Sequence, residues 1–199
     1  MPLTLNQYLK ICGFNKLGKN IDQSLSQKSF LISQLRMPNI KNILEIGFNA
    51  GHSSFLFLTK SKAKVVSFDL ANQAHSAKAK TYLDSRFPGR HQLVTGDSKA
   101  ALPDYVTKNP NQKFDLIFID GSTDPNVTWS DLRNCKNLAH KDTIVVMNNV
   151  VLNQKWRKPE NVGPTETWNK ARAKRLVVEH GHIDLKLANG WSWGKFVLV

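Results

Sequence analysis

A glycine-rich segment, residues 45–53 (EIGFNAGHS), has the residue types of a loop that binds a cofactor. Gly47 and Gly51 remove side chains where a ligand must approach the backbone, and the start of the following helix offers free N–H groups. The spacing is E-x-G-x-x-x-G, whereas loops that bind a pyrophosphate favour G-x-G-x-x-G. Glu45 would repel a pyrophosphate, so the segment favours a cofactor without phosphates. An ordinary glycine-rich turn is the alternative interpretation.

Acidic residues after the next two apolar runs strengthen the cofactor interpretation. Asp69 ends one run, and at the tip of the second strand of a doubly wound sheet a carboxylate can accept both hydroxyls of a ribose. Asp97 and Ser98 follow the next run, where a carboxylate or a hydroxyl could bind an adenine amino group. Three such positions in one regular order are hard to obtain by chance, and we therefore expect a bound cofactor.

The elements that must position these residues are five short apolar runs separated by helical patterns. Each run is rich in Ile, Val, Leu or Phe, as strands covered on both faces are. The runs are 42–47, 64–70, 91–96, 114–120 and 143–150. Their spacing leaves room for one crossover helix between successive strands. We predict an α/β fold with a doubly wound, mostly parallel sheet.

The two ends of the chain depart from this rhythm. We predict a single domain, residues 1–199. Its first part, 1–37, looks helical, and its second part, 38–199, contains the strands. A polar loop, 153–164, precedes a helix predicted from about Thr165 to Glu179, with Thr165 as its N-cap. Alternating residues at 183–187 and 191–199, with a turn at 188–190, predict a terminal antiparallel hairpin.

Five motifs resemble those of class I S-adenosylmethionine-dependent methyltransferases, and within that class the catechol-type and related small O-methyltransferases. They are ILEIGFNAGHSSFLFL, VVSFDL, LVTGDS, FDLIFIDGS and IVVMNNV, and the likeness runs from about residue 27 to 199. It implies a Rossmann-like seven-stranded sheet whose last strand is antiparallel, in agreement with the terminal hairpin. The resemblance also implies that Gly47 and Gly51 lie under the methionine moiety, and that Ser53 contacts its carboxylate. The expected cofactor-binding residues are Glu45, Gly47, Phe48, Asn49, Gly51, Ser53, Asp69, Asp97, Ser98 and Asp120.

The reacting end of the site departs from the family pattern. In the catechol-type branch a divalent cation such as Mg²⁺ lowers the pKa of the acceptor hydroxyl, and its implied ligands here are Asp120, Asn148 and Asn149. Asn148 replaces a carboxylate, which should weaken a magnesium site. The alternative is that Asp120 ends a strand and the asparagines cap or turn the next loop. Asp120 is still expected to line the active cleft.

No histidine or lysine occupies the positions just after Asp120, which read GSTDP. A lysine-based mechanism at that loop is therefore not supported. If a base is used, Asp120 or Asp124 could serve, and we expect Asp120 to be the catalytic residue, ahead of Asp124. Methyl transfer from a sulfonium is an in-line displacement in which the protein mainly positions the reactants and helps to deprotonate the acceptor.

Basic residues outnumber acidic ones by 28 to 15, a formal net charge of +13. Seven of them fall between residues 153 and 175, after the strand that ends at Asn148. We expect the loop residues Lys155, Trp156 and Arg157 to bind the acceptor, with the charge favouring an anionic one. A solvated helix face is the alternative, and no recognisable nucleic-acid module is present.

Composition excludes several classes of protein. No apolar run approaches the ~20 residues of a membrane span, and the first residues lack the apolar stretch of a secretory signal. Two cysteines are too few for a disulfide framework, so we expect a reducing, cytoplasmic location. The function predicted is S-adenosylmethionine-dependent O-methylation of a small acceptor. The alternatives are methylation of RNA or another polyanion, and a cofactor-binding protein that has lost turnover.

Overall fold

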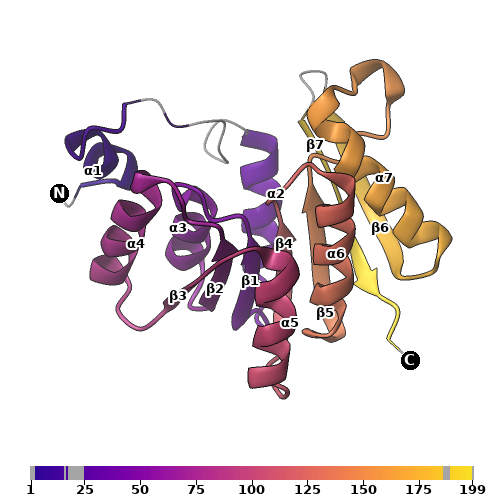
Figure 1. Ribbon diagram of the computed structural model, residues 1–199, viewed down its shortest axis with the longest axis horizontal. Coiled ribbons are helices and arrows are strands. Elements are labelled where there is room, and N and C mark those ends of the chain that lie inside the picture. The colour runs from indigo at the N-terminus through magenta and orange to yellow at the C-terminus, as the bar shows by residue number, and fades with distance from the viewer. Residues whose placement is uncertain (1–2, 16, 18–24, 186–188, 199) are drawn as a thin grey trace.

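The computed structural model describes residues 3–15, 17, 25–185 and 189–198, and its strands form one seven-stranded sheet (Figure 1). The strands are β1 (Asn42–Ile46), β2 (Lys64–Asp69), β3 (His91–Thr95), β4 (Phe114–Ile119), β5 (Ala139–Asn148), β6 (Val177–Leu185) and β7 (Asn189–Phe196). The helices are α1 (Leu5–Ile11), α2 (Leu25–Leu35), α3 (His52–Lys60), α4 (Ala74–Arg86), α5 (Ser98–Lys108), α6 (Pro125–Lys136) and α7 (Pro159–Ala173), with a short 3₁₀ helix, η2 (Gln154–Trp156).

The order of the strands shows where the sheet can bind a ligand, which is here called its ligand-binding edge: the carboxyl ends of its parallel strands. The order is β3-β2-β1-β4-β5-β7-β6, and β1 to β5 run parallel while β7 is antiparallel to both β5 and β6. The chain winds outward in opposite directions from β1 and β4. At such a switch point, doubly wound sheets bind ligands beyond the carboxyl ends of the strands. The predicted α/β, Rossmann-like sheet with a terminal antiparallel hairpin is confirmed.

Apolar side chains cover both faces of the sheet, which explains the nearly continuous apolarity of its parallel strands. One cluster joins α1–α4 to the sheet through residues such as Leu9, Leu31 and Phe57. The second joins α5, α6 and α7 to the opposite face and includes Leu102 and Trp168. These three helices stand in a row on one side of the sheet (Figure 1). The two layers hold the strand ends in fixed relative positions.

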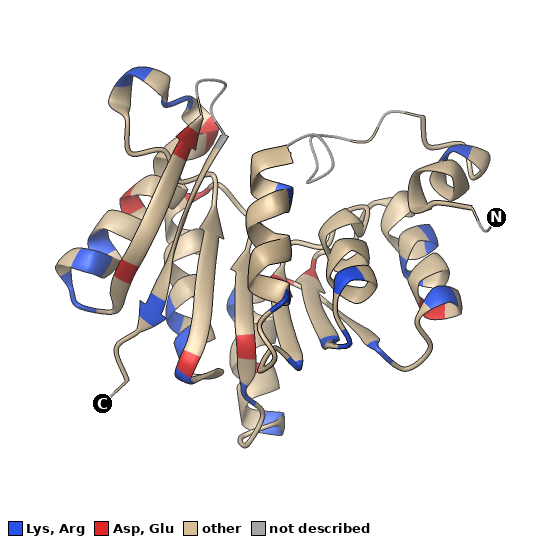
Figure 2. Cartoon of the chain, turned by 180° about the vertical axis from the view of Figure 1, so that it is seen from behind, with Lys and Arg blue, Asp and Glu red and all other residues tan. Residues whose placement is uncertain are grey.

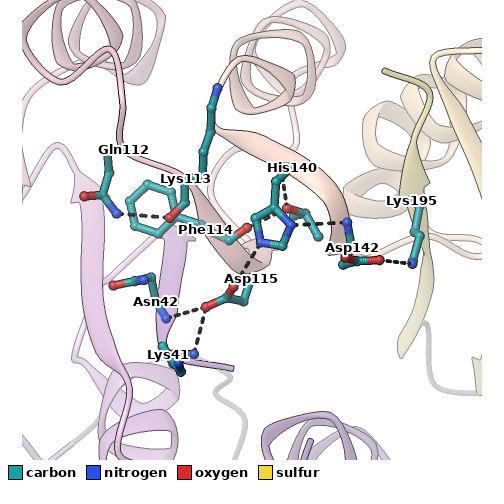
Figure 3. A network of polar contacts seen from close by, with 10 residues as sticks. Lys41, Asn42, Gln112, Lys113, Phe114, Asp115, His140, Asp142 and Lys195 are labelled. Carbon is teal, nitrogen blue, oxygen red and sulfur yellow. Dashed lines mark hydrogen bonds and ion pairs between the residues drawn. The ribbon is translucent and has the colours of Figure 1, made fainter. Parts of the chain in front are cut away.

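A polar network ties the strands together at the edge opposite the ligand-binding edge (Figure 3). The Asp115 carboxylate accepts hydrogen bonds from the backbone N–H groups of Lys41 and Asn42, both at 2.8 Å, where the chain enters β1. His140 in β5 donates from Nε2 to Asp115 at 2.9 Å, and its Nδ1 accepts from the Asp142 N–H at 3.2 Å. Asp115 thereby holds the starts of β1, β4 and β5 together.

Helix α7 differs from its predicted boundaries at both ends. It begins at Pro159, which takes the favoured first helical position, while the Asn161 side chain accepts from the Lys158 N–H at 3.0 Å. Thr165 is therefore not an N-cap; it lies inside the helix and its hydroxyl accepts from the Val151 N–H at 3.0 Å. The helix ends at Ala173, because Arg175 adopts a left-handed conformation (φ 52°) that turns the chain into β6. The predicted turn at 188–190 lies partly outside the described residues.

Lysine and arginine are spread over many elements, from the N-terminal helices to the C-terminal hairpin (Figure 2). Several are used locally: Lys80 pairs with Asp84 and Lys108 with Asp104 along their helices. The net charge of +13 is therefore not gathered on one element. Within the described ranges, no helix combines the length and apolarity needed to cross a bilayer.

Candidate active site

A cavity of about 520 Å³ opens at the carboxyl ends of β1 to β4, the edge predicted for ligand binding. This volume is in the range that holds a small-molecule cofactor. The predicted site residues that line it are Gly47, Asn49, Asp69, Asp97, Ser98 and Asp120. The further lining residues include Leu70, Ser76, Ser122, Val127 and Asp131. The tertiary structure thus brings together most of the predicted cofactor residues.

The glycine loop takes a shape that other residues could not adopt. Gly47 has φ +99°, and a Cβ atom there would lie 2.2 Å from the backbone oxygen of Asp120. Gly51 has φ +73°, and a Cβ there would lie 2.9 Å from the Phe48 ring. The first glycine therefore allows β1 to approach the end of β4, and the second lets α3 start directly beside the loop.

Asp69 holds the loop to the tip of β2. Its Oδ2 accepts hydrogen bonds from the backbone N–H groups of Phe48 at 2.8 Å and Asn49 at 2.9 Å, and its Oδ1 accepts from the Ala71 N–H at 2.6 Å. An ionised carboxylate has about four lone-pair sites, so acceptor capacity remains on the side that lines the cavity.

Four predicted cofactor residues do not line the cavity: Glu45, Phe48, Gly51 and Ser53. Glu45 is buried, and its carboxylate accepts hydrogen bonds from the hydroxyls of Ser54 and Ser67, the latter at 2.5 Å. Burial raises the pKa of Glu45, and the serine hydroxyls lower it in part. Its place is under the loop, not against the ligand.

Ser67 in β2 links Glu45 to His91 in β3, whose Nε2 lies 3.0 Å from the serine hydroxyl. Burial lowers the pKa of His91 to about 4, and its ring stacks on Phe48 with centroids 5.1 Å apart. No spacing in the sequence predicts this cluster, because its members come from different strands.

Asp120 lies at the end of β4, half-buried at the base of the cavity. Its Oδ1 accepts a hydrogen bond from the Asn148 side-chain amide at 2.7 Å. Burial raises the pKa of Asp120 to about 7; the nearby Glu45 carboxyl raises it further, and the Asn148 hydrogen bond opposes both. An acid that ionises near neutral pH in a cleft has the properties of a general base.

Two of the three residues implied as metal ligands, Asp120 and Asn148, are hydrogen-bonded to each other. Asn148 donates to Asp120 and accepts through its Oδ1 from the Gln27 side-chain amide of α2 at 2.5 Å. The Asn148 group that faces Asp120 is therefore a donor, where a cation needs an acceptor oxygen. Asn149 has φ 60°, and its backbone carbonyl accepts from the Asn161 amide at 3.1 Å. Among the described residues, no three His, Cys, Asp or Glu side chains are grouped as metal ligands. The set does not fit Mg²⁺.

The predicted acceptor residues Lys155, Trp156 and Arg157 lie in and just after η2 and do not line the cavity. Arg157 donates from Nε to the Val151 carbonyl at 3.1 Å, which anchors this segment to the chain leaving β5. Lys155 is exposed and Trp156 half-buried. They follow the carboxyl end of β5, which runs parallel to β4, so they lie beyond the same end of the strands as Asp120.

Sequence reasoning missed Asp131, an acidic residue on the cavity side of α6. Its side chain is 0 % exposed and lines the cavity. Within the described part of the chain, neither carboxylate oxygen has a hydrogen-bond partner of normal geometry. Burial raises its pKa to about 6, and the nearby Ser98 hydroxyl lowers it in part. The available signal was an acid between the apolar residues Val127, Leu132 and Cys135 of one helix.

Comparison with known proteins gives the family. Residues 44–150 match the family described as a methyltransferase domain, which is more than half of the chain. The chain belongs to this methyltransferase family, and the resemblance to class I S-adenosylmethionine-dependent methyltransferases is confirmed. No curated protein sequence matches the chain.

Solved structures agree on the fold. An O-methyltransferase from Bacillus cereus in complex with SAH has a TM-score of 0.76 at 20% identity, covering 98% of this chain and 92% of that one. The O-methyltransferase TomG from Streptomyces achromogenes, in complex with SAM, has a TM-score of 0.74 at 18% identity and covers 96% and 87%. The SAH-bound methyltransferase PaMTH1 from Podospora anserina has a TM-score of 0.68 at 19% identity and covers 99% and 89%.

Proposed function

We propose that this chain binds S-adenosylmethionine in the cavity and transfers its methyl group to an oxygen of a small acceptor. The observation that carries the proposal is Asp69, fixed by three backbone N–H groups at the mouth of a 520 Å³ cavity between the glycine loop and β3. A carboxylate held in this way keeps an acceptor site for a ribose hydroxyl. Similar structures with SAM or SAH bound support the same cofactor.

The cofactor supplies an activated sulfonium methyl group, and this chain's own residues supply the rest. Backbone of the Gly47 loop and the Asp69 carboxylate position the cofactor against the end of β4. Asp120, at the base of the cavity, accepts the proton of the acceptor hydroxyl, and Asn148 holds its carboxylate in place. Deprotonation by a positioned base makes the oxygen a better nucleophile, and proximity to the methyl group contributes most of the remaining rate.

The acceptor is proposed to be small and anionic, bound by the segment that contains Lys155, Trp156 and Arg157. The position of η2 shortly after β5, the strand whose last residue Asn148 bonds to Asp120, supports this role, as does the excess of basic residues between 153 and 175. A cytoplasmic location also belongs to the proposal, supported by two free thiols, Cys12 and Cys135.

Asp69→Ala tests cofactor binding. We expect the affinity for S-adenosylhomocysteine, measured by calorimetry, to fall by about 100-fold or more, because charge-assisted hydrogen bonds to the ribose and the clamp on the loop are both lost. Asp104→Ala is the matched control: this acid is exposed on α5 and pairs only with Lys108 along the helix in the described structure, so the affinity should not change. Unchanged affinity in Asp69→Ala would rule out the proposed site.

Asn148→Asp tests whether the hydrogen-bonded chain has replaced a cation site. The change puts a second carboxylate beside Asp120, and two such groups at this distance favour a shared cation or a shared proton. We expect the variant to bind Mn²⁺, seen by calorimetry and by a rise in its thermal unfolding midpoint with added Mn²⁺, while the wild type gives neither. Asn148→Ala, which adds no charge, is the control. Equal binding of Mn²⁺ by the wild type would contradict this account.

A further inference from the structure

Asp131 is a buried acid whose partner is absent from the described protein. It lies in α6, is 0 % exposed, and lines the cavity, yet neither of its oxygens accepts a hydrogen bond of normal geometry within the described residues. Leaving a buried carboxylate without a donor costs free energy that folding does not recover. An unsatisfied buried group in a native protein calls for a specific explanation, and a ligand that supplies the missing donor is one, since this group lines the cavity.

The surroundings of Asp131 indicate which end of the cavity it serves. Three of its charged and polar neighbours, Ser98, Asp97 and Lys99, lie at the turn from β3 into α5, and a fourth, Cys135, lies one turn along α6. The Lys99 charge lowers the pKa of Asp131 in part, but the Lys99 ammonium lies 3.8 Å from the Asp97 carboxylate, and among the described residues no ion pair joins Lys99 to Asp131. Asp131 therefore lies at the end of the cavity next to the turn from β3 into α5, and β3 is the outermost strand on this half of the sheet.

The other acid at this end, Asp97, is already occupied. Its side chain caps α5 by accepting from the Lys99 N–H at 3.0 Å, and it is 53% exposed. An exposed carboxylate that caps a helix discriminates little between ligands, because water satisfies it equally well. The buried oxygens of Asp131 have no such alternative, so a ligand donor there makes a larger difference to the affinity.

We propose that the Asp131 carboxylate accepts a hydrogen bond from the exocyclic amino group of the cofactor's adenine and so selects a 6-aminopurine. This inference rests on the proposed function, because it takes the cavity to be the cofactor site. It assigns the purine selectivity to α6, whereas Asp97 and Ser98 were expected from sequence to contact the adenine. A purine without the amino group leaves the buried carboxylate unpaired and is rejected.

The experiment is a thermodynamic cycle between one ligand group and one side chain. Calorimetry at pH 8 measures the binding of S-adenosylhomocysteine and of its analogue with unsubstituted purine, which lacks only the 6-amino group. We expect the wild type to prefer the amino ligand by about 10- to 100-fold, as for a hydrogen bond to a charged group. In Asp131→Leu the preference should fall below about threefold. Asp131→Asn, which keeps an acceptor oxygen, should retain part of it.

A second measurement separates this role from a structural one. If Asp131 serves only the ligand, the ligand-free Asp131→Leu protein should unfold at an equal or higher temperature than the wild type, because an unpaired buried charge has been removed. Asp97→Ala, which loses a helix cap, is the control and should keep the preference for the amino group.

The outcomes are distinguishable. A wild type that binds S-adenosylhomocysteine with no preference for the amino group overturns this inference and leaves the proposed function standing. The same is true if Asp131→Leu weakens both ligands equally, or lowers the unfolding temperature while the preference is kept. A wild type that binds neither ligand overturns the proposed function and this inference with it.

Discussion

Asp120→Asn is expected to lower kcat by about 100- to 10,000-fold, the usual contribution of a positioned general base. Asparagine has the shape of aspartate and can still accept the hydrogen bond from Asn148, so the end of β4 should keep its conformation. The affinity for S-adenosylhomocysteine should therefore change little. The measurement is steady-state kinetics with an acceptor found by screening, together with calorimetry on the same preparation.

The pH dependence provides an independent check on Asp120. Because burial raises the pKa of this carboxyl to about 7, the fraction able to accept a proton falls about tenfold for each pH unit below 7. Wild-type kcat should rise with pH and level off above 7, and the residual activity of Asp120→Asn should lack this step. A profile without an inflection near neutral pH would contradict the assignment.

Asp124→Asn is the matched control for the base. Asp124 lies four residues after Asp120 and caps α6 by accepting from the N–H groups of Asn126 and Val127. Asparagine caps helices as well as aspartate does, so stability and activity should both remain close to wild type. If instead Asp124→Asn abolished activity and Asp120→Asn did not, the base would be Asp124.

Gly47→Ala is expected to reduce the free energy of unfolding by about 2–5 kcal/mol and to abolish cofactor binding. Two effects add here. An alanine in a left-handed conformation costs roughly 1–2 kcal/mol, and its Cβ would lie 2.2 Å from the backbone oxygen of Asp120. The atoms that this Cβ would meet belong to the backbone of Asp120 and Gly121 and not to a flexible side chain. The ends of β1 and β4 must therefore separate beside the cavity. Urea unfolding and calorimetry measure the two effects.

Gly89→Ala separates these effects, because Gly89 also has a positive φ, +70°, and has no atom within 4 Å of its added Cβ. Its loss of stability should be limited to the backbone cost, with cofactor affinity unchanged. Equal losses in the two variants would show that the close approach of Gly47 to Asp120 has no energetic consequence.

The cofactor loop at Gly47 and the proposed base Asp120 both depend on the close approach of the ends of β1 and β4. Gly47 allows the approach, and the Asp120 backbone N–H completes it by donating to the Ile46 carbonyl at 2.8 Å. The cofactor loop and the catalytic carboxylate are therefore parts of one rigid unit. This explains why a change at Gly47 should affect binding, whereas a change in the Asp120 side chain should affect only the chemical step.

The strands and the residues at their tips were determined by the sequence alone. Five buried parallel strands have a local signature, an apolar run that ends in a polar residue. This signature predicts that Gly47, Asp69, Ser98 and Asp120 lie at one end of the strands, and all four line the cavity there. The boundary of α7 was not determined in this way. Thr165 directly after Pro164 reads locally as a helix start, but the helix begins at Pro159 and continues through Gly163 and Pro164, which are buried in a helix that packs chiefly against α6.

Only the tertiary structure decided which groups the polar residues near the strand ends contact. Asn148 meets Gln27, which is 121 positions away, and Glu45 meets serines of α3 and β2, contacts that no local pattern encodes. Asp131 looks like one more acid on a helix until the fold buries it beside the cavity, where its oxygens accept no hydrogen bond of normal geometry from the described residues. Apolar periodicity reports which face of an element is covered, since hydrophobic burial is non-directional. A hydrogen bond depends on direction and on distances of about 3 Å, so its partner is known only when the chain has folded.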